Sequence, residues 1–187
     1  MNPAFKAAYD KADLRGGWMQ RNEAWLLWHA AMDTPERGTI VEIGSWRGRS
    51  TTLFAETGRN VVAVDPLIAG WGVNGNNMEI DATAREKFQR VVDSYENLTW
   101  HCLQSLSVDL FHFRRPIDML YIDADHIYPA PLNDFVHFAP KLRRKAFVAF
   151  HDYLSQDGVG RSIDELIKAS RIEKIAIAGG LWLGMTT

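Results

Sequence analysis

Two apolar runs of the sequence, residues 117–122 and 146–150, are followed at once by side chains that can bind a cation or move a proton. These side chains are carboxylates and imidazoles: Asp123, Asp125, His126, His151 and Asp152. Each run predicts a buried strand, and parallel strands present their carboxyl ends at one edge of a sheet, where ligands bind. Three oxygen or imidazole ligands on adjacent strand ends can hold a divalent ion with positions open for substrate and water. We therefore predict a metal site formed by Asp123, His151 and Asp152.

The identity of the ion depends on whether an imidazole joins the carboxylates. Magnesium prefers oxygen ligands, whereas His151 as a ligand would favour manganese, iron or zinc. We expect Mg²⁺ or Mn²⁺. In the alternative interpretation, Asp123 and Asp152 hold no ion and only form hydrogen bonds with a small ligand or with loops.

A general base is predicted next to this metal site. His126 stands three residues after Asp123. Because histidine titrates near neutral pH, it suits the removal of a proton from a metal-bound hydroxyl group. We predict His126 as this base and Asp125 as the second candidate. The alternative is a histidine with a purely structural role.

A strand, a glycine turn and a helix are predicted near the start of the chain. Residues 39–43 are a β-branched run typical of a buried strand. Gly44 and Gly48 follow it, and a helix capped by Ser50 or Thr51 is predicted next. This succession is the ligand-binding corner of a doubly wound α/β fold.

The glycine spacing indicates the kind of ligand. A dinucleotide fingerprint that starts at Gly44 would need glycine where Trp46 and Arg49 stand, and the Gly-Lys-Ser/Thr of a P-loop is absent as well. The turn therefore suits a nucleoside-like ligand without a diphosphate. Asp65, 21 residues beyond Gly44, follows a predicted strand at residues 61–64 and can accept hydrogen bonds from both ribose hydroxyls. We expect Asp65 to face solvent, so that its replacement would weaken ligand binding and barely change stability.

Four motifs occur in order along the chain: Glu42-x-Gly44-x-x-x-Gly48-x-Ser50, Val64-Asp65, the run from Ile117 to His126, and Ala149-Phe150-His151-Asp152-Tyr153. Together they resemble class I S-adenosylmethionine-dependent methyltransferases. The last two motifs make the chain similar to the metal-dependent O-methyltransferases of the catechol and macrolide-sugar type. The likeness covers roughly residues 16–185, and it depends on the order and spacing of the motifs rather than on one of them.

The resemblance implies S-adenosyl-L-methionine as the cofactor and a set of residues that hold it: Glu42, Gly44, Ser45, Trp46, Ser50, Asp65, Ser105 and Asp123. In the resembled family the acid matched by Glu42 helps to hold the amino-acid end of the cofactor through the amides of the turn. Trp46 matches an aromatic position beside the cofactor, with plain packing as the alternative. Ser50 matches a residue that binds the methionine carboxylate, and Ser105 one beside the adenine.

The chain departs from the resembled family at the last motif. Metal-dependent relatives usually carry an acid followed by an acid or amide where this chain has His151 and Asp152. This difference leaves the identity of the metal open. At the position of His126, catechol-type relatives have a lysine base, and sugar-modifying relatives can have histidine.

The predicted fold class is α/β, a Rossmann-like doubly wound seven-stranded sheet, mostly parallel, with a C-terminal antiparallel hairpin. We expect one domain over residues 1–187, with an N-terminal helical cover at 1–35 and the Rossmann-like core at 36–187. A helix over residues 23–32, capped by Asn22, is predicted within the cover. The basic residues 141–145 are interpreted as the C-terminal end of a helix.

Composition limits the function classes. The chain has 187 residues, 47% of them hydrophobic, and a net charge of −2. This charge gives no general attraction to nucleic acid or to an acidic membrane, and we expect neither as a partner. The single cysteine, Cys102, permits no internal disulfide and agrees with a reducing compartment. Together with the lack of an apolar run of signal-peptide or membrane-span length, this predicts a cytoplasmic protein.

These observations predict a methyltransferase that moves a methyl group from S-adenosylmethionine to a hydroxyl oxygen of a small molecule with the help of a metal. The alternatives are a metal-independent methyltransferase, a catalytically inactive nucleoside-binding protein of the same fold, and, less favoured, a nucleotide-dependent oxidoreductase. Residues 66–80 predict either a mobile lid that carries Trp71 or a disordered insertion. The tryptophan-rich helix of the cover makes a homodimer plausible, and the sequence does not name the methyl acceptor.

Overall fold

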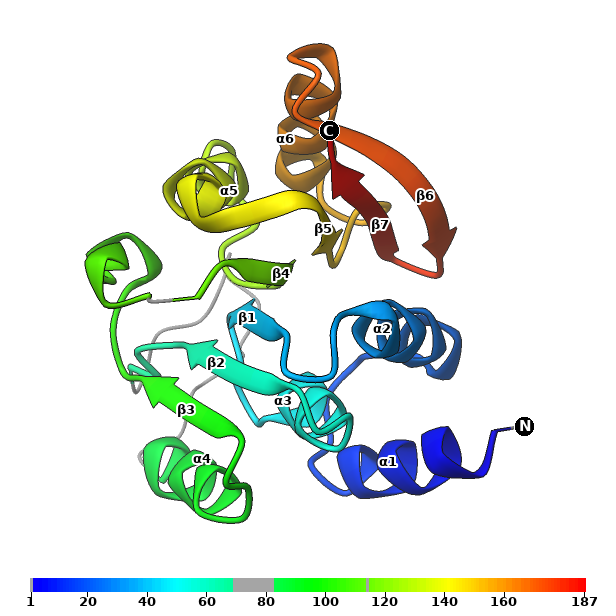
Figure 1. Ribbon diagram of the computed structural model, residues 1–187, viewed down its shortest axis with the longest axis vertical. Coiled ribbons are helices and arrows are strands. Elements are labelled where there is room, and N and C mark those ends of the chain that lie inside the picture. The colour runs from blue at the N-terminus through cyan, green and yellow to red at the C-terminus, as the bar shows by residue number, and fades with distance from the viewer. Residues whose placement is uncertain (1, 69–82, 114) are drawn as a thin grey trace.

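The computed structural model describes residues 2–68, 83–113 and 115–187 (Figure 1). In these residues, seven strands form one sheet in the order β3-β2-β1-β4-β5-β7-β6. The pairs from β3 to β5 are parallel, and β7 runs antiparallel to both β5 and β6. The predicted Rossmann-like sheet with an antiparallel C-terminal hairpin is therefore confirmed. The strands are β1 Thr39–Ile43, β2 Asn60–Val64, β3 Leu98–His101, β4 Ile117–Ile122, β5 Leu142–Phe150, β6 Ile172–Ala178 and β7 Leu181–Thr186.

The register brings the ends of the central strands into one row. Ile43 of β1 pairs with Val64 of β2 and Ile122 of β4, and Ile122 pairs with Phe150 of β5. The next residue of each strand still donates its amide to a neighbouring strand: Gly44, Asp65, Asp123 and His151. Because the strand order reverses between β1 and β4, these residues surround the topological switch point, where ligands bind in such sheets.

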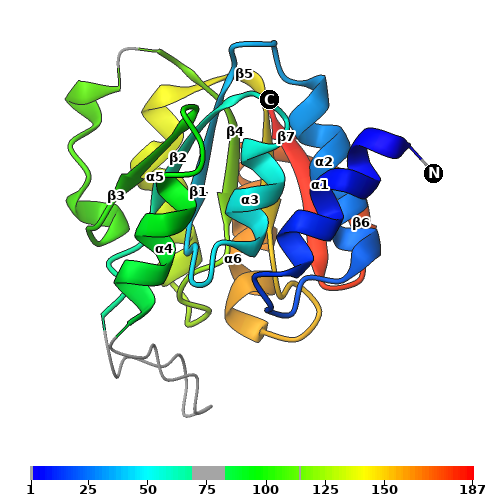
Figure 2. The ribbon, with the colours of Figure 1, turned by 90° about the horizontal axis from the view of Figure 1, so that it is seen from below.

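Six helices of the described chain cover the two faces of the sheet. Helices α1 to α4 lie on one face, and α5 and α6 lie on the other (Figure 2). Alternate residues of the central strands therefore enter two cores. Met119 and Tyr121 of β4 join the first core, while Leu120 and Ile122 join the second, as expected for parallel strands buried on both faces. The helices are α1 Pro3–Asp13, α2 Arg21–Asp33, α3 Arg49–Ala55, α4 Ala84–Val92, α5 Ala130–Phe138 and α6 Asp157–Lys168.

The two N-terminal helices pack against the first core. Phe5 of α1 is buried and meets Trp25 of α2 edge-on, with ring centroids 4.8 Å apart. The segment between α1 and α2 is held to α3, because the Arg49 guanidinium donates to the carbonyl of Gly17 at 2.7 Å. The end of this segment, Trp18 and Met19, reaches the carboxyl edge of the sheet.

Several predicted boundaries are wrong for identifiable reasons. Helix α2 begins at Arg21 with Gln20 at its N-cap, not at Glu23 after Asn22, because Gln20 and Glu23 form the capping box. Of the basic residues 141–145, only Lys141 ends a helix, the 3₁₀ turn Ala139–Lys141, because strand β5 begins at Leu142. There, pairing of Leu142 with Ile117 of β4 outweighs local composition.

Helix α3 also begins earlier than predicted. Its N-cap is Gly48 in the left-handed conformation, with φ of 80°, so Ser50 and Thr51 lie within the helix and cap nothing. Their hydroxyls are thereby free to turn toward the sheet. A Cβ at Gly48 would also lie 3.1 Å from the Phe88 ring, which gives this glycine a packing role as well.

The predicted lid at residues 66–80, with Trp71, lies outside the described residues except for its first three positions. In the ranges that the structure describes, no helix has the length and apolarity needed to cross a membrane.

Candidate active site

A cavity of about 810 Å³ opens at the carboxyl edge of the sheet, around the switch point between β1 and β4. Every predicted site residue except Glu42 lines it: Gly44, Ser45, Trp46, Ser50, Asp65, Ser105, Asp123, Asp125, His126, His151 and Asp152. The structure therefore brings together residues from five strand ends. A cavity of this size matches the range of small-molecule sites.

The turn after β1 requires glycine for a close approach to β4. Gly44 has φ of 85°, and a Cβ there would lie 2.1 Å from the backbone oxygen of Asp123. Its amide also donates to Val64 at 3.0 Å. Glycine at this position thus lets the turn pack directly against the end of β4.

Glu42 supports this turn from beneath. It is fully buried, and its Oε2 accepts hydrogen bonds from the hydroxyls of Ser45, at 2.9 Å, and of Thr51. Its Oε1 has no hydrogen-bond partner among the described residues. Burial raises the pKa of Glu42 from 4.5 to about 7, although the hydroxyls of Ser50, Thr51 and Ser45 favour the charged form. The expected contact of Glu42 with the turn amides is not present, because Glu42 bonds side chains instead.

Asp65 makes the contact with the turn amides. Its Oδ2 accepts from the amides of Ser45 and Trp46, both at 2.8 Å, and its Oδ1 accepts from the amide of Leu67 at 2.8 Å. Asp65 is only 8% exposed, so the expectation that it faces solvent is wrong. Three amides, two of them in buried hydrogen bonds, depend on this carboxylate, and it supports the turn as well as lining the cavity. Burial raises the pKa of Asp65, although these three hydrogen bonds favour its charged form and lower the pKa.

Two tryptophans stand side by side at the cavity wall. Trp46 has φ of 41°, and its ring lies 5.3 Å from that of Trp18, which belongs to the segment before α2. Trp18 remains 67% exposed. The N-terminal cover thus contributes to the cavity.

On the opposite wall, Ser105 donates its hydroxyl to Asp134 of α5. Asp134 is 5% exposed, and burial raises its pKa from 3.8 to about 6. Ser105 lies in the 3₁₀ turn Ser105–Ser107 that follows β3, and both residues line the cavity. The pair therefore presents a hydroxyl and a titratable carboxyl group at this wall of the cavity.

The carboxylates at the ends of β4 and β5 each have one oxygen held by a hydroxyl group. Asp123 Oδ2 accepts from buried Tyr121 at 2.8 Å, and Asp152 Oδ1 accepts from Ser155 at 2.8 Å. Asp152 also has φ of 59°, a strained conformation for a residue with a side chain. The remaining oxygens, Asp123 Oδ1 and Asp152 Oδ2, face two imidazoles.

His126 is the first of these imidazoles. Its Nε2 lies 3.2 Å from Asp152 Oδ2 and 3.9 Å from Asp123 Oδ1, and this buried nitrogen forms no hydrogen bond within the described chain. One ligand atom from each of these three residues lies within 4.8 Å of the others, which is a spacing that could hold a metal ion. Burial opposes a charge on His126, but the carboxylates of Asp123 and Asp152 raise its pKa.

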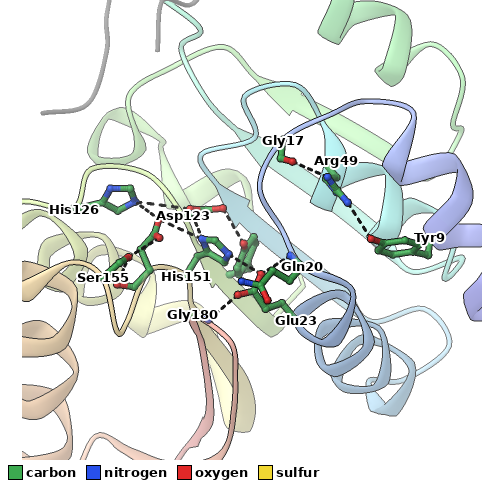
Figure 3. A network of polar contacts seen from close by, with 12 residues as sticks. Tyr9, Gly17, Gln20, Glu23, Arg49, Asp123, His126, His151, Ser155 and Gly180 are labelled. Carbon is green, nitrogen blue, oxygen red and sulfur yellow. Dashed lines mark hydrogen bonds and ion pairs between the residues drawn. The ribbon is translucent and has the colours of Figure 1, made fainter. Parts of the chain in front are cut away.

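His151 is the second imidazole, and it lies between Asp123 and Glu23 (Figure 3). Its Nδ1 is 3.5 Å from Asp123 Oδ1 and 3.3 Å from Asp152 Oδ2, while its Nε2 is 3.2 Å from Glu23 Oε2. Burial opposes its charge, but the carboxylates around it raise the pKa of His151 to about 11. The hydrogen bond from His151 is the main cause that lowers the pKa of Asp152 to about 2. In the absence of an ion, this cluster therefore contains an imidazolium beside two carboxylates.

Two acidic residues of this site were missed by the sequence reasoning. Glu23 and Asp134 come from helices rather than from strand ends, so the motifs do not include them. A signal was present: each falls on the buried face of its helix, four residues before Leu27 and Phe138 respectively. A carboxylate on an apolar face requires a partner.

Comparisons with known proteins agree with this architecture. The sequence model of a family described as "Methyltransferase domain" (Methyltransf_24) matches residues 41–153. The uncharacterized protein R132 of Acanthamoeba polyphaga mimivirus is 29% identical over 120 residues, which are 62% of this chain and 51% of that protein. The match thus spans about half the length of that curated relative.

Solved structures show the same fold. A candidate caffeoyl-CoA O-methyltransferase from Staphylococcus aureus superimposes with a TM-score of 0.70 at 16% identity, over 100% of this chain and 93% of that chain. An O-methyltransferase from Bacillus cereus in complex with S-adenosylhomocysteine gives a TM-score of 0.62 at 17% identity, over 100% and 92%. At these identities the similarity concerns the fold.

Proposed function

Because the chain belongs to the family of methyltransferase domains, we propose that it transfers a methyl group from S-adenosyl-L-methionine to a hydroxyl oxygen of a small molecule, assisted by a divalent ion. The family match confirms the resemblance predicted from the four motifs. The observation that carries the proposal is the pair of carboxylate oxygens of Asp123 and Asp152, with the imidazoles of His126 and His151 beside them, in the same cavity as the Gly44 turn.

The cofactor half of the site comprises the turn after β1 and the end of β2. S-adenosylmethionine, when bound, supplies a methyl group activated on a sulfonium. Gly44, Ser45 and Trp46 would form the floor beneath it. Asp65 would support that floor through its hydrogen bonds with the amides of Ser45 and Trp46, and would also accept hydrogen bonds from the ribose. Glu42 does not line the cavity, so its role is indirect: it fixes Ser45 and Thr51. Ser50 and Ser105 line the cavity and remain candidates for the methionine and adenine ends.

The metal half fits a divalent ion by its donor set. Asp123 and Asp152 each leave one oxygen directed at the cluster, and hydroxyl groups fix the other oxygen of each carboxylate. Mg²⁺ is typically bound by one or two carboxylates together with water, and Mn²⁺ also accepts an imidazole. When bound, such an ion lowers the pKa of a hydroxyl group. Asp123 and Asp152 are the proposed ligands, with His151 as the third.

His126 is the proposed general base. Its Nε2 is buried at the cavity without a hydrogen bond from the described residues, so it can take a proton from the acceptor hydroxyl. Asp152 Oδ2, at 3.2 Å, would stabilise the imidazolium that forms. Asp125 is exposed and accepts from the amide of Ile127 at 2.9 Å, which makes it the weaker candidate. The cavity walls would hold donor and acceptor in line, and such positioning supplies much of the rate in group transfer.

Calorimetric titration tests the proposal in two steps. S-adenosylhomocysteine should bind and NAD should not. Mn²⁺ should bind in the presence of S-adenosylhomocysteine and should do so more weakly in Asp152→Ala. If NAD binds and S-adenosylhomocysteine does not, the proposed function is wrong and the oxidoreductase alternative gains support.

One observation favours a metal-independent methyltransferase as the second candidate. His151 Nδ1 lies 3.5 Å from Asp123 Oδ1 and 3.3 Å from Asp152 Oδ2, and these carboxylates raise its pKa, so His151 itself would neutralise part of their charge. In that case His126 would act as base with Asp152 alone. Full turnover in the presence of excess chelator would support this candidate over metal assistance.

The acceptor and the assembly are also matters of proposal. Exposed apolar side chains at the cavity, Trp18, Leu106 and Ile127, suit a small acceptor with an apolar body. Trp25 of α2 is 39% exposed, which leaves a homodimer through the N-terminal cover as a proposal. Sedimentation analysis would test it.

A further inference from the structure

A buried carboxylate of the N-terminal cover lies behind the metal cluster. Glu23, in the first turn of α2, is only 2% exposed. In a capping box, one oxygen of this side chain accepts a hydrogen bond from the amide of Gln20, and Oε2 of Glu23 does so at 2.6 Å. Capping alone does not require burial, so the other contacts of Glu23 need a separate explanation.

The carboxylate of Glu23 joins three segments that are far apart in the sequence. Oε2 accepts from Gln20 and lies 3.2 Å from Nε2 of His151, at the end of β5. Oε1 accepts from the amide of Gly180 at 2.6 Å, in the turn between β6 and β7. A Cβ at Gly179 would lie 2.5 Å from Oε1, so this turn is shaped around the carboxylate. Figure 3 shows Glu23 between Gln20, Gly180 and His151.

His151 extends these contacts to the cluster. Nε2 of His151 faces Glu23, and Nδ1 is the nitrogen that faces Asp123 Oδ1 and Asp152 Oδ2. These are the same two oxygens that no hydroxyl group holds. A histidine beside a metal usually gives its other N–H to a carboxylate, which fixes the ring orientation.

We propose that Glu23 is a positioning residue of the metal site: it fixes the His151 ring, and His151 in turn holds the two carboxylate oxygens that receive the ion. The inference rests on the proposed metal-assisted function. It makes the N-terminal cover, which lies outside the family match at residues 41–153, part of the metal site. Glu23 does not line the cavity and touches no substrate.

A double-mutant cycle on metal affinity tests this chain of contacts. Mn²⁺ binding is measured by calorimetry in the presence of saturating S-adenosylhomocysteine for the parent, Glu23→Gln, His151→Asn and the double variant. In Glu23→Gln at least one of the three donors faces an amide NH₂ group instead of an oxygen: Gly180 if that group replaces Oε1, or both Gln20 and His151 if it replaces Oε2. Loss of such an outer partner typically weakens metal affinity about 10- to 100-fold. We expect each single variant to show this loss and the double variant to be no weaker than the worse single variant.

A matched control separates this effect from general loosening of the cover. Glu56 also ties the N-terminal region to the core, because it accepts from Lys11 of α1 and from Tyr95, each at 2.8 Å. Glu56→Gln should keep the Mn²⁺ affinity of the parent. S-adenosylhomocysteine affinity should stay within about twofold in all of these variants, since none of the changed residues belongs to the cofactor half.

The outcomes separate the inference from the proposed function. If the parent binds no Mn²⁺, metal assistance fails and the inference with it. If the parent binds Mn²⁺ and Glu23→Gln binds it equally well, the inference alone is overturned. If the fold-losses of Mn²⁺ affinity in the two single variants multiply in the double variant, the inference is also overturned, because Glu23 would then act independently of His151. If Glu23→Gln does not fold, the same cycle with Glu23→Asp, which keeps the charge but shortens the side chain, decides by the same criterion.

Discussion

Replacing Glu42 by glutamine should remove a pH dependence from the stability of the fold. Glu42 is fully buried, and its Oε1 has no partner among the described residues. Burial raises its pKa from 4.5 to about 7. The difference between these values corresponds to roughly 3 kcal/mol, at about 1.4 kcal/mol per pH unit. This is the free energy by which folding disfavours the ionised form of Glu42 relative to its protonated form.

The sign follows from proton binding. Between about pH 4.5 and pH 7 the native protein holds the Glu42 proton more tightly than the unfolded chain does. The stabilisation by protonated Glu42 is therefore fully present below about pH 4.5 and is lost as pH rises toward 7. Glutamine cannot ionise, and its amide oxygen can still accept from Ser45 and Thr51.

Urea unfolding at a series of pH values from 4.5 to 8 measures this effect. The free energy of unfolding of the parent, relative to that of Glu42→Gln, should fall by roughly 3 kcal/mol over this range and stay level above pH 7. Thr51→Val removes a donor to Oε2 and should deepen the fall. A difference between parent and Glu42→Gln that does not change with pH would refute the reasoning.

Three further predictions concern the cavity. Asp65→Ala should leave three amides of the turn without an acceptor and cost at least about 1–3 kcal/mol of stability, or roughly 2–12 °C in melting temperature for a chain of this size. It should also weaken S-adenosylhomocysteine binding, and an unchanged melting temperature would contradict the prediction. Asp152→Ala should lose Mn²⁺ but keep S-adenosylhomocysteine, whereas His126→Ala should keep both and lose about 10²- to 10⁴-fold in turnover; loss of Mn²⁺ in His126→Ala would make this histidine a ligand instead of the base. Gly44→Ala would place a Cβ 2.1 Å from Asp123 O, so calorimetry should find the binding of S-adenosylhomocysteine and of Mn²⁺ weakened together. Loss of only one of the two would contradict the idea that the Gly44 turn supports both.

The fold was predictable because its signals are local and repeated. Each central strand is an apolar or β-branched run that ends in glycine or a polar residue, as at Ile43–Gly44 and Val64–Asp65. The errors occurred where pairing with distant residues outweighs composition. Strand β5 begins at Leu142, within a basic cluster, because β4 offers a partner from Ile117 onward.

The strand-end residues of the site were predictable for the same reason, since a parallel sheet aligns its carboxyl ends. Their hydrogen bonds were not. Nothing in the sequence indicates that Asp65, rather than Glu42, binds the turn amides, because this depends on the φ angles of Gly44 and Trp46. Glu23 reaches His151 only because α2 packs near the β6–β7 turn, 157 residues later in the chain. Such a contact depends on the tertiary packing of the cover.

Asp123 connects the two halves of the cavity. Its backbone oxygen lies where a side chain at residue 44 would clash, so its backbone positions the Gly44 turn, the proposed floor of the cofactor site. Its carboxylate, fixed at Oδ2 by Tyr121, presents Oδ1 to His126 and His151. Since a single residue sets both positions, the distance between the turn and the proposed metal site is set by the pairing of β1 with β4 at Ile43 and Ile122. A reaction that requires donor and acceptor in line benefits from this arrangement, because the two halves are attached to adjacent strands of one rigid sheet rather than to separate loops.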